Sequence, residues 1–168
     1  MKAETKCIFA ALDQYVPGEE VLYVGCHPHR RSPKWLNEIK SRGATAVDAL
    51  EIFQPNVLAI REQGIFRTVY HGSIASGTPK KYGLIFWWQG PEHLPRYTAL
   101  ETLKSLAAQH IHVIAGSPHG VYEQGPEYGN PHEVHVAHFL PEDFLSIGYQ
   151  AEAFGPVNKR RSHIVLWR

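Results

Sequence analysis

The sequence has little cysteine and no long hydrophobic run. Its two cysteines, Cys7 and Cys26, lie far apart and lack CxxC spacing, which excludes a disulfide framework and a cysteine zinc site as organising features. No stretch approaches the ~20 consecutive apolar residues of a membrane helix, and the first residues lack the apolar centre of a signal peptide. We therefore expect a cytoplasmic protein with no membrane partner.

The sequence also lacks an excess of charge of one sign. Lysine and arginine total 17 and aspartate and glutamate total 16, so the formal net charge is +1. This balance disfavours a purely electrostatic nucleic-acid binder. Histidine is frequent by contrast, and its 11 residues offer candidate bases or metal ligands.

Apolar segments run through the whole chain without an internal repeat or linker. At one domain per ~100–200 residues, the length of 168 residues predicts a single domain. We divide it into a leading helix (residues 1–17), a core (18–155) and a last edge strand (156–168).

Short apolar segments alternate with segments of helical spacing, which predicts an α/β fold with a mostly parallel sheet and helices on both faces. The last two apolar segments predict a C-terminal antiparallel hairpin at the sheet edge. A long polar loop, 116–132, precedes a short helix that begins at Pro141. The predicted strands are 20–25, 44–47, 66–70, 82–88, 111–115, 149–154 and 163–167, and the longer helices are 32–42, 52–62 and 94–109.

A glycine turn and a later acid mark a candidate ligand site. Open α/β sheets bind ligands beyond the carboxyl ends of their strands. Gly25 follows the first strand, and Asp48 follows the second, about 20 residues later, which is typical of dinucleotide or adenosyl sites where the acid binds ribose hydroxyls. His27 and His29 stand where further glycines are usual, so an ordinary tight turn is the alternative interpretation of Gly25.

Several motifs together resemble the class I S-adenosylmethionine-dependent methyltransferases over about residues 18–155. They are Val21-Leu22-Tyr23-Val24-Gly25-Cys26, Ala46-Val47-Asp48, the run from Tyr82 to Trp88 that continues into Gln89-Gly90-Pro91-Glu92-His93-Leu94, Asn130-Pro131-x-Glu133-Val134-His135, and Pro141-Glu142-Asp143-Phe144. The resemblance implies a Rossmann-like, seven-stranded methyltransferase fold and S-adenosylmethionine as cofactor. The cofactor-binding residues it implies are Gly25, Cys26, His27, Asp48, Ser73, Ile74, Trp88, Gln89 and Gly90.

The chain departs from this family at several positions. Tyr23 stands where an acid usually contacts the methionine amino group, and Ser73 replaces an acid beside the adenine. Each missing charge-assisted hydrogen bond costs about 1.5–3 kcal/mol of binding free energy. A non-catalytic relative that keeps the fold as a binding or assembly module is therefore the alternative function.

Glu92 and His93 follow the fourth strand at the start of a helix, where a base would face the cleft. We predict catalytic roles for both. The alternatives are a helix-dipole interaction for Glu92 and simple packing for His93.

The spacing Gln89-x-x-Glu92-His93 with the later His135 resembles the metal-binding set of the small-RNA 3′-end 2′-O-methyltransferases. This resemblance implies that Glu92, His93 and His135 hold a divalent metal. Gln89 replaces an acid, so Zn²⁺, Ni²⁺ or Mn²⁺ would suit the set better than Mg²⁺. The alternative is that His135 bonds the backbone of the 116–132 loop.

We predict a methyltransferase that acts on a small-molecule or carbohydrate-like acceptor. A metal-assisted ribose 2′-O-methyltransferase is the third possibility, after the binding module, and a nicotinamide oxidoreductase ranks last because the proton-relay motif Tyr-x-x-x-Lys is missing. The long loop, the leading helix or a second subunit of a homo-oligomer would enclose the acceptor. The basic run Lys159-Arg160-Arg161 is interpreted as solvated.

Overall fold

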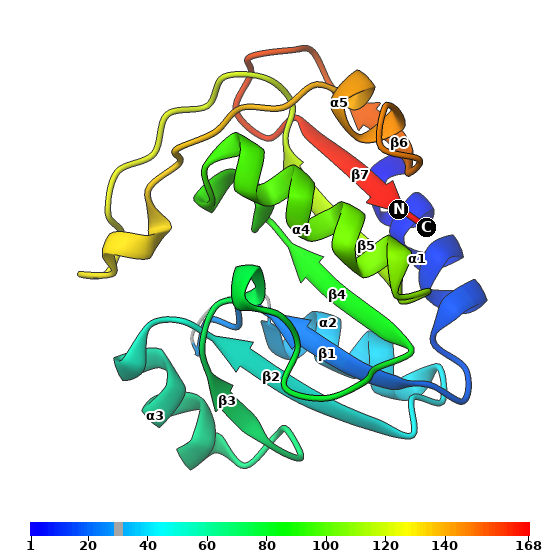
Figure 1. Ribbon diagram of the computed structural model, residues 1–168, viewed down its shortest axis with the longest axis vertical. Coiled ribbons are helices and arrows are strands. Elements are labelled where there is room, and N and C mark those ends of the chain that lie inside the picture. Colours follow the sequence, from blue (N-terminus) through cyan, green and yellow to red (C-terminus); the bar gives the residue numbers. More distant parts are fainter. Residues whose placement is uncertain (29–31) are drawn as a thin grey trace.

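The computed structural model describes residues 1–28 and 32–168, whose strands form one seven-stranded sheet in the order β3-β2-β1-β4-β5-β7-β6 (Figure 1). His29 lies outside the described residues. The first five strands pair in parallel, and β7 runs antiparallel between β5 and β6. The predicted mostly parallel sheet with an antiparallel C-terminal hairpin is confirmed. The strands are β1 (Glu20–Val24), β2 (Ala46–Glu51), β3 (Val69–His71), β4 (Leu84–Trp88), β5 (His112–Pro118), β6 (Gln150–Phe154) and β7 (His163–Trp167).

Helices pack on both faces of the sheet, as predicted. Buried side chains of α1, α2 and α3 form one apolar core with one face, and those of α4 and α5 form a second core with the other. The helices are α1 (Ala3–Tyr15), α2 (Ser32–Ser41), α3 (Gln54–Gln63), α4 (Arg96–Ala108) and α5 (Pro141–Leu145), with 3-10 turns at Ile74–Ser76, Pro91–His93 and Pro131–Glu133. None of the described helices combines the length and apolarity needed to cross a membrane.

The central strand β4 has the sequence Leu-Ile-Phe-Trp-Trp, and all five side chains are buried. β4 lies between β1 and β5, and its side chains alternate between the two helix-covered cores, so both of its faces are covered by helices. This explains its continuous apolar character, which is typical of a parallel sheet.

Two strands extend farther than the sequence pattern predicts. β2 continues to Glu51, and β5 continues to Pro118. The chain then forms an irregular segment, residues 119–139, which we call the covering segment. It runs past the carboxyl ends of the central strands (yellow in Figure 1) and is anchored where Gly120 N donates to Phe139 O at 2.9 Å and Val136 N donates to Glu92 O at 2.9 Å.

Candidate functional site

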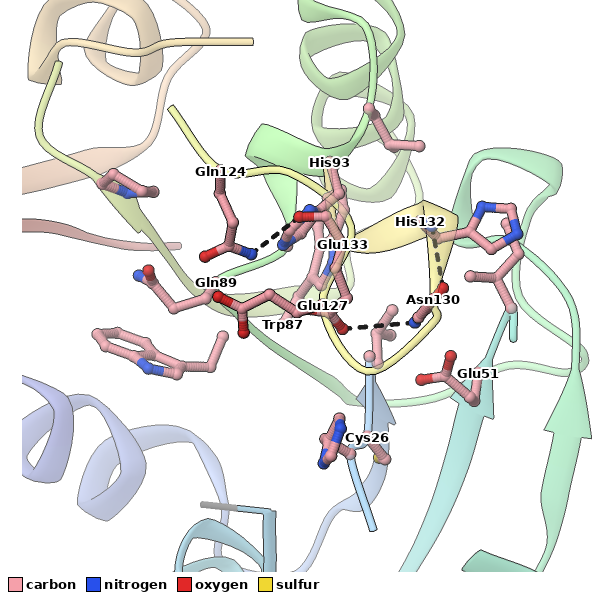
Figure 2. Close-up of a pocket in the computed structure, with 18 of the residues that line it drawn as sticks. Cys26, Glu51, Trp87, Gln89, His93, Gln124, Glu127, Asn130, His132 and Glu133 are labelled. Atoms are coloured by element: carbon pink, nitrogen blue, oxygen red, sulfur yellow. Dashed lines mark hydrogen bonds between the residues drawn. The ribbon is translucent and has the colours of Figure 1, made fainter. Parts of the chain in front are cut away.

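A cavity of about 780 Å³ lies at the carboxyl edge of the parallel strands. Its walls come from the ends of β1, β2 and β4, and the covering segment adds side chains from above (Figure 2). The ring of Tyr128 in that segment lies 5.1 Å from the ring of His27, between centroids, and so joins the covering segment to the β1–α2 connection. Open parallel sheets bind ligands at this edge.

Most of the predicted cofactor residues line this cavity. Three predicted residues of the site, Asp48, Glu92 and His135, are not among its lining residues, whereas His93 is. Trp87, Tyr122 and Tyr128 line the cavity as well, and Trp87 is also part of the apolar core. The predicted cofactor residues at the cavity are Gly25, Cys26, His27, Ser73, Ile74, Trp88, Gln89 and Gly90.

The predicted position of Asp48 at the ligand site is wrong. Asp48 lies inside β2, fully buried, and its carboxylate accepts hydrogen bonds from Arg67 at 2.8 and 2.6 Å and from the Tyr82 hydroxyl at 2.8 Å. Although burial opposes ionisation, the hydrogen bonds from Arg67 and Tyr82 hold the pKa of Asp48 below its usual value. The side chain therefore belongs to a structural ion-pair network.

Glu51, the last residue of β2, is the acid that reaches the cavity. Its side chain is buried, and its Oε1 accepts a hydrogen bond from Phe53 N at 2.8 Å. Burial raises the pKa of Glu51 to about 7. The sequence pattern missed it because the strand was predicted to end at Val47, which would have placed Glu51 beyond the turn.

Two glycines shape the cavity wall in different ways. Gly25 has a φ of +73°, and a Cβ added there would meet open space. The backbone of this turn is therefore accessible from the cavity, in a conformation that L side chains rarely adopt. Gly90 is needed for packing, since a Cβ would lie 1.8 Å from Nε1 of Trp87.

Glu92, His93 and His135 come together beside the cavity. One ligand atom of each residue lies within 4.8 Å of the others. Nδ1 of His93 lies 3.2 Å from Val134 O, and Nδ1 of His135 lies 2.6 Å from Tyr122 O. Because a carbonyl only accepts hydrogen bonds, both Nδ1 atoms carry the proton in the neutral rings, and Nε2 is then the acceptor nitrogen of each ring. The bond from His135 to the loop backbone matches the alternative that its sequence position suggested.

Glu92 is buried, with 1% of its surface exposed. Burial raises the pKa of its carboxyl group to about 8. Neither carboxyl oxygen has a hydrogen bond of acceptable geometry to the described residues, and Oε1 lies 4.0 Å from Nε2 of His93. The buried Ser117 hydroxyl acts against this rise in pKa. Buried polar groups nearly always have partners, so the carboxyl group is suited to hold a proton or to bind a ligand.

No family model and no curated protein matches this sequence. Solved structures match its fold. An S-adenosylmethionine-dependent methyltransferase from Mesorhizobium loti is 13% identical, with a TM-score of 0.66 over 99% of this chain and 97% of that one. DhpI with SAH is 13% identical, with a TM-score of 0.63 over 98% and 84%. Magnesium protoporphyrin IX methyltransferase (ChlM) from Synechocystis PCC 6803, with bound SAM, is 18% identical, with a TM-score of 0.62 over 98% and 77%.

This chain has the class I methyltransferase fold. At these identities the likeness concerns the fold, and function has to be argued from the site. The methyltransferase fold places two further features at the cavity that the sequence pattern did not single out as site residues. They are Glu51 and the basic run Lys159-Arg160-Arg161.

Proposed function

We propose that this chain binds S-adenosylmethionine in the cavity and transfers its methyl group to a small-molecule or carbohydrate-like acceptor. The observation that carries the proposal is the pairing of the open turn at Gly25 with the buried carboxyl group of Glu51, at adjacent strand ends of a methyltransferase sheet. A carboxylate in this position suits the two hydroxyl donors of a ribose.

The chain departs from the usual cofactor contacts in two places. Tyr23 packs against Phe66 and Phe86, with ring centroids 5.9 and 5.1 Å away. Oγ of Ser73 accepts a hydrogen bond from Ala75 N at 3.2 Å, so it caps the following turn. Neither residue offers a carboxylate to the cofactor, and we therefore expect weaker binding than in a site with all its acids.

His93 is the candidate base. It lines the cavity, and the bond from its Nδ1 to Val134 O leaves Nε2 as the proton acceptor. Bound S-adenosylmethionine would supply the activated methyl group. His93 Nε2 would take the proton from an acceptor hydroxyl as the methyl group is transferred, and Oε1 of Glu92 lies 4.0 Å from this same nitrogen.

Calorimetric titration with S-adenosylhomocysteine tests the cofactor site. Glu51→Gln should weaken binding by about tenfold or more, because a neutral amide forms weaker bonds with ribose hydroxyls than a carboxylate does. The variant keeps an acceptor for Phe53 N. Glu101→Gln is the matched control, because the half-exposed Glu101 lies on α4 outside the cavity and pairs with Lys104. If neither S-adenosylmethionine nor S-adenosylhomocysteine binds at millimolar concentration, the non-catalytic alternative is favoured.

A second candidate, metal-assisted transfer, is supported by the unpartnered carboxyl group of Glu92 beside two oriented imidazoles. Two imidazoles and one carboxylate form a donor set that suits Mn²⁺, Ni²⁺ or Zn²⁺. The backbone carbonyls at both Nδ1 atoms act as the outer contacts that orient such ligands. Gln89 Nε2 is also buried without a partner among the described residues.

Elemental analysis and titration with Mn²⁺ test this candidate. We expect about one ion per chain in the wild type, and loss of binding in His135→Ala but not in His138→Ala, whose histidine lies outside the cluster. A wild-type protein that binds no ion and transfers methyl groups equally well in EDTA would leave His93 and Glu92 as an acid–base pair.

A further inference from the structure

The turn between β6 and β7 carries the basic run Lys159-Arg160-Arg161, whose side chains line the cavity. The sheet register explains this position. β7 runs antiparallel to β5, so its first residue, His163, pairs with Pro118 at the carboxyl end of β5. The residues just before β7 are therefore brought to the same edge as the ends of β1 and β4.

Hydrogen bonds hold this turn in place. Asn158 N donates to His119 O at 2.8 Å, and His119 N donates to Ser162 O at 3.0 Å. The side-chain Oδ1 of Asn158 accepts from Val121 N at 2.6 Å. In Figure 1 the β6–β7 connection lies beside the start of the covering segment. The basic run is thus fixed against the cavity and is not part of a free tail.

The side chains of Lys159, Arg160 and Arg161 differ from several other arginines of the chain in that they have no carboxylate partner among the described residues. Arg42, Arg67 and Arg96 each pair with carboxylates. Within residues 1–28 and 32–168, no side-chain hydrogen bond or ion pair engages the basic run. Adjacent cations at the mouth of a cavity attract anions and form charge-assisted bonds with phosphate oxygens.

The charges in the cavity are separated by element. Its carboxylates come from the end of β2, Glu51, and from the covering segment, Glu127 and Glu133. Among the described lining residues, the lysine and arginine side chains come from the β6–β7 turn, on the other side of β4 and β5 in the strand order. His93 follows β4 and so lies between the two sides. Carboxylates suit a sulfonium cofactor that also carries an ammonium group, whereas the basic run suits a negatively charged acceptor.

We propose that the acceptor is a phosphate-bearing small molecule and that Lys159, Arg160 and Arg161 bind its phosphate group. This inference rests on the proposed function and narrows the acceptor class. A phosphate carries nearly two negative charges, which match several adjacent cations better than a single carboxylate does. The phosphate would lie on the β5 and β7 side, with the hydroxyl to be methylated directed toward His93.

The test uses inorganic pyrophosphate as a phosphate probe and acetate as a carboxylate probe, titrated calorimetrically into the full-length protein with saturating S-adenosylhomocysteine. Pyrophosphate should bind in the wild type and weaken about tenfold or more in the double variant Lys159→Gln/Arg160→Gln. Arg161 is left intact, so that the positive-φ position of the turn keeps its own residue. Acetate should bind much more weakly than pyrophosphate.

Lys81→Gln is the control for the loss of a surface lysine, since Lys81 is exposed at the opposite end of the sheet, before β4. It should leave pyrophosphate binding unchanged, and both variants should keep the wild-type affinity for S-adenosylhomocysteine. No pyrophosphate binding in the wild type, equal binding in the double variant, or acetate binding as tight as pyrophosphate binding would each overturn the inference. Lack of S-adenosylhomocysteine binding would contradict the proposed function. Pyrophosphate titrated alone would still measure anion binding by the basic run.

A second arm compares acceptors in matched pairs, each sugar with and without a phosphate group, using isotopically labelled S-adenosylmethionine. The phosphorylated member should accept more label, and the double variant should raise its KM about tenfold or more while changing kcat little. Equal labelling of both members would overturn the inference.

Discussion

Asp48 and Glu51 belong to the same strand, but their carboxyl groups meet different surroundings. Asp48 pairs in register with Leu22 inside the sheet, whereas Glu51 lies one residue past the Val24–Leu50 pair at the end of β1. Glu51 therefore meets the cavity, and Asp48 meets Arg67 and Tyr82. Two acids three positions apart on one strand therefore have different roles. Glu51 is the candidate ligand contact, and Asp48 forms a structural ion pair.

Binding of S-adenosylhomocysteine should release a proton near pH 7. The raised pKa of Glu51, about 7, means that part of the free protein carries a proton on this carboxyl group at neutral pH. Hydrogen bonds from ribose hydroxyls favour the ionised form, so affinity should rise from pH 6 to pH 8. Calorimetry in two buffers of different ionisation enthalpy measures the proton released.

The same pKa sets the sign of the effect on stability. Because folding raises the pKa of Glu51 from 4.5 to about 7, its ionisation opposes folding, and the wild type should lose stability relative to Glu51→Gln as the pH rises from 4.5 to 7. The variant should also bind with no proton release. Proton release of the wild-type size in Glu51→Gln would assign the titration to another group.

At the scale of elements, an ion-pair network connects the amino-terminal ends of strands. Arg67 bonds to Asp48 of β2 and to Glu20 of β1, and Lys80, just before β4, pairs with Glu20 as well. The network lies away from the cavity, so its members serve to hold the strands in register. A substitution there should alter stability and leave ligand binding unchanged.

Asp48→Asn should lower the free energy of unfolding by about 1–3 kcal/mol, because it weakens two charge-assisted bonds at a buried position. The half-exposed Arg67 can still meet water, which keeps the loss within this range. Chemical denaturation at pH 7 measures the loss, and calorimetry should show unchanged S-adenosylhomocysteine binding.

Asp13→Asn is the control, since Asp13 forms an exposed pair with Arg42 and should cost less. The lowered pKa of Asp48 stabilises the fold above its unfolded value of 3.8, so the difference between wild type and Asp48→Asn should shrink as the pH falls through and below that value. Weakened S-adenosylhomocysteine binding in Asp48→Asn would contradict this structural role and indicate that Asp48 contacts the ligand.

At the scale of the whole molecule, one sheet edge collects every feature of the candidate site. The turn at Gly25, the end of β2, the Glu92–His93 turn, the covering segment and the β6–β7 turn all meet there. A ligand bound among them would connect both halves of the sheet, and its binding energy would add to the stability of the fold.

S-adenosylhomocysteine at 100 times its Kd should add about 2.7 kcal/mol to the free energy of unfolding. For a domain of this size, each kcal/mol raises Tm by roughly 2–4 °C, so a shift of roughly 5–10 °C is expected in a thermal melt. The shift should be smaller in Glu51→Gln at the same ligand concentration and unchanged in Glu101→Gln. An unchanged Tm at millimolar ligand would contradict the cofactor site.

The sequence predicted the sheet, its helical layers and the neighbourhood of His93, because these depend on local patterns. The apolar run of β4 and the alternation of strands with helices can be recognised from the sequence without knowledge of any tertiary contact. The residue at which a strand ends is harder to predict, since Ala49 and Leu50 continue an apolar pattern that fits a strand or a helix start equally well. The acid at the cavity was therefore misassigned.

The sequence by itself determined the α/β fold, through the periodicity of its apolar residues, and it placed Glu92 and His93 after the central strand. The tertiary structure decided which charged residues reach the cavity. Glu51 reaches the cavity because β2 extends one residue beyond the end of β1. The run Lys159-Arg160-Arg161 reaches it because β7 pairs antiparallel with β5. Both outcomes depend on register between strands distant in sequence, and that register is set by packing of the whole sheet.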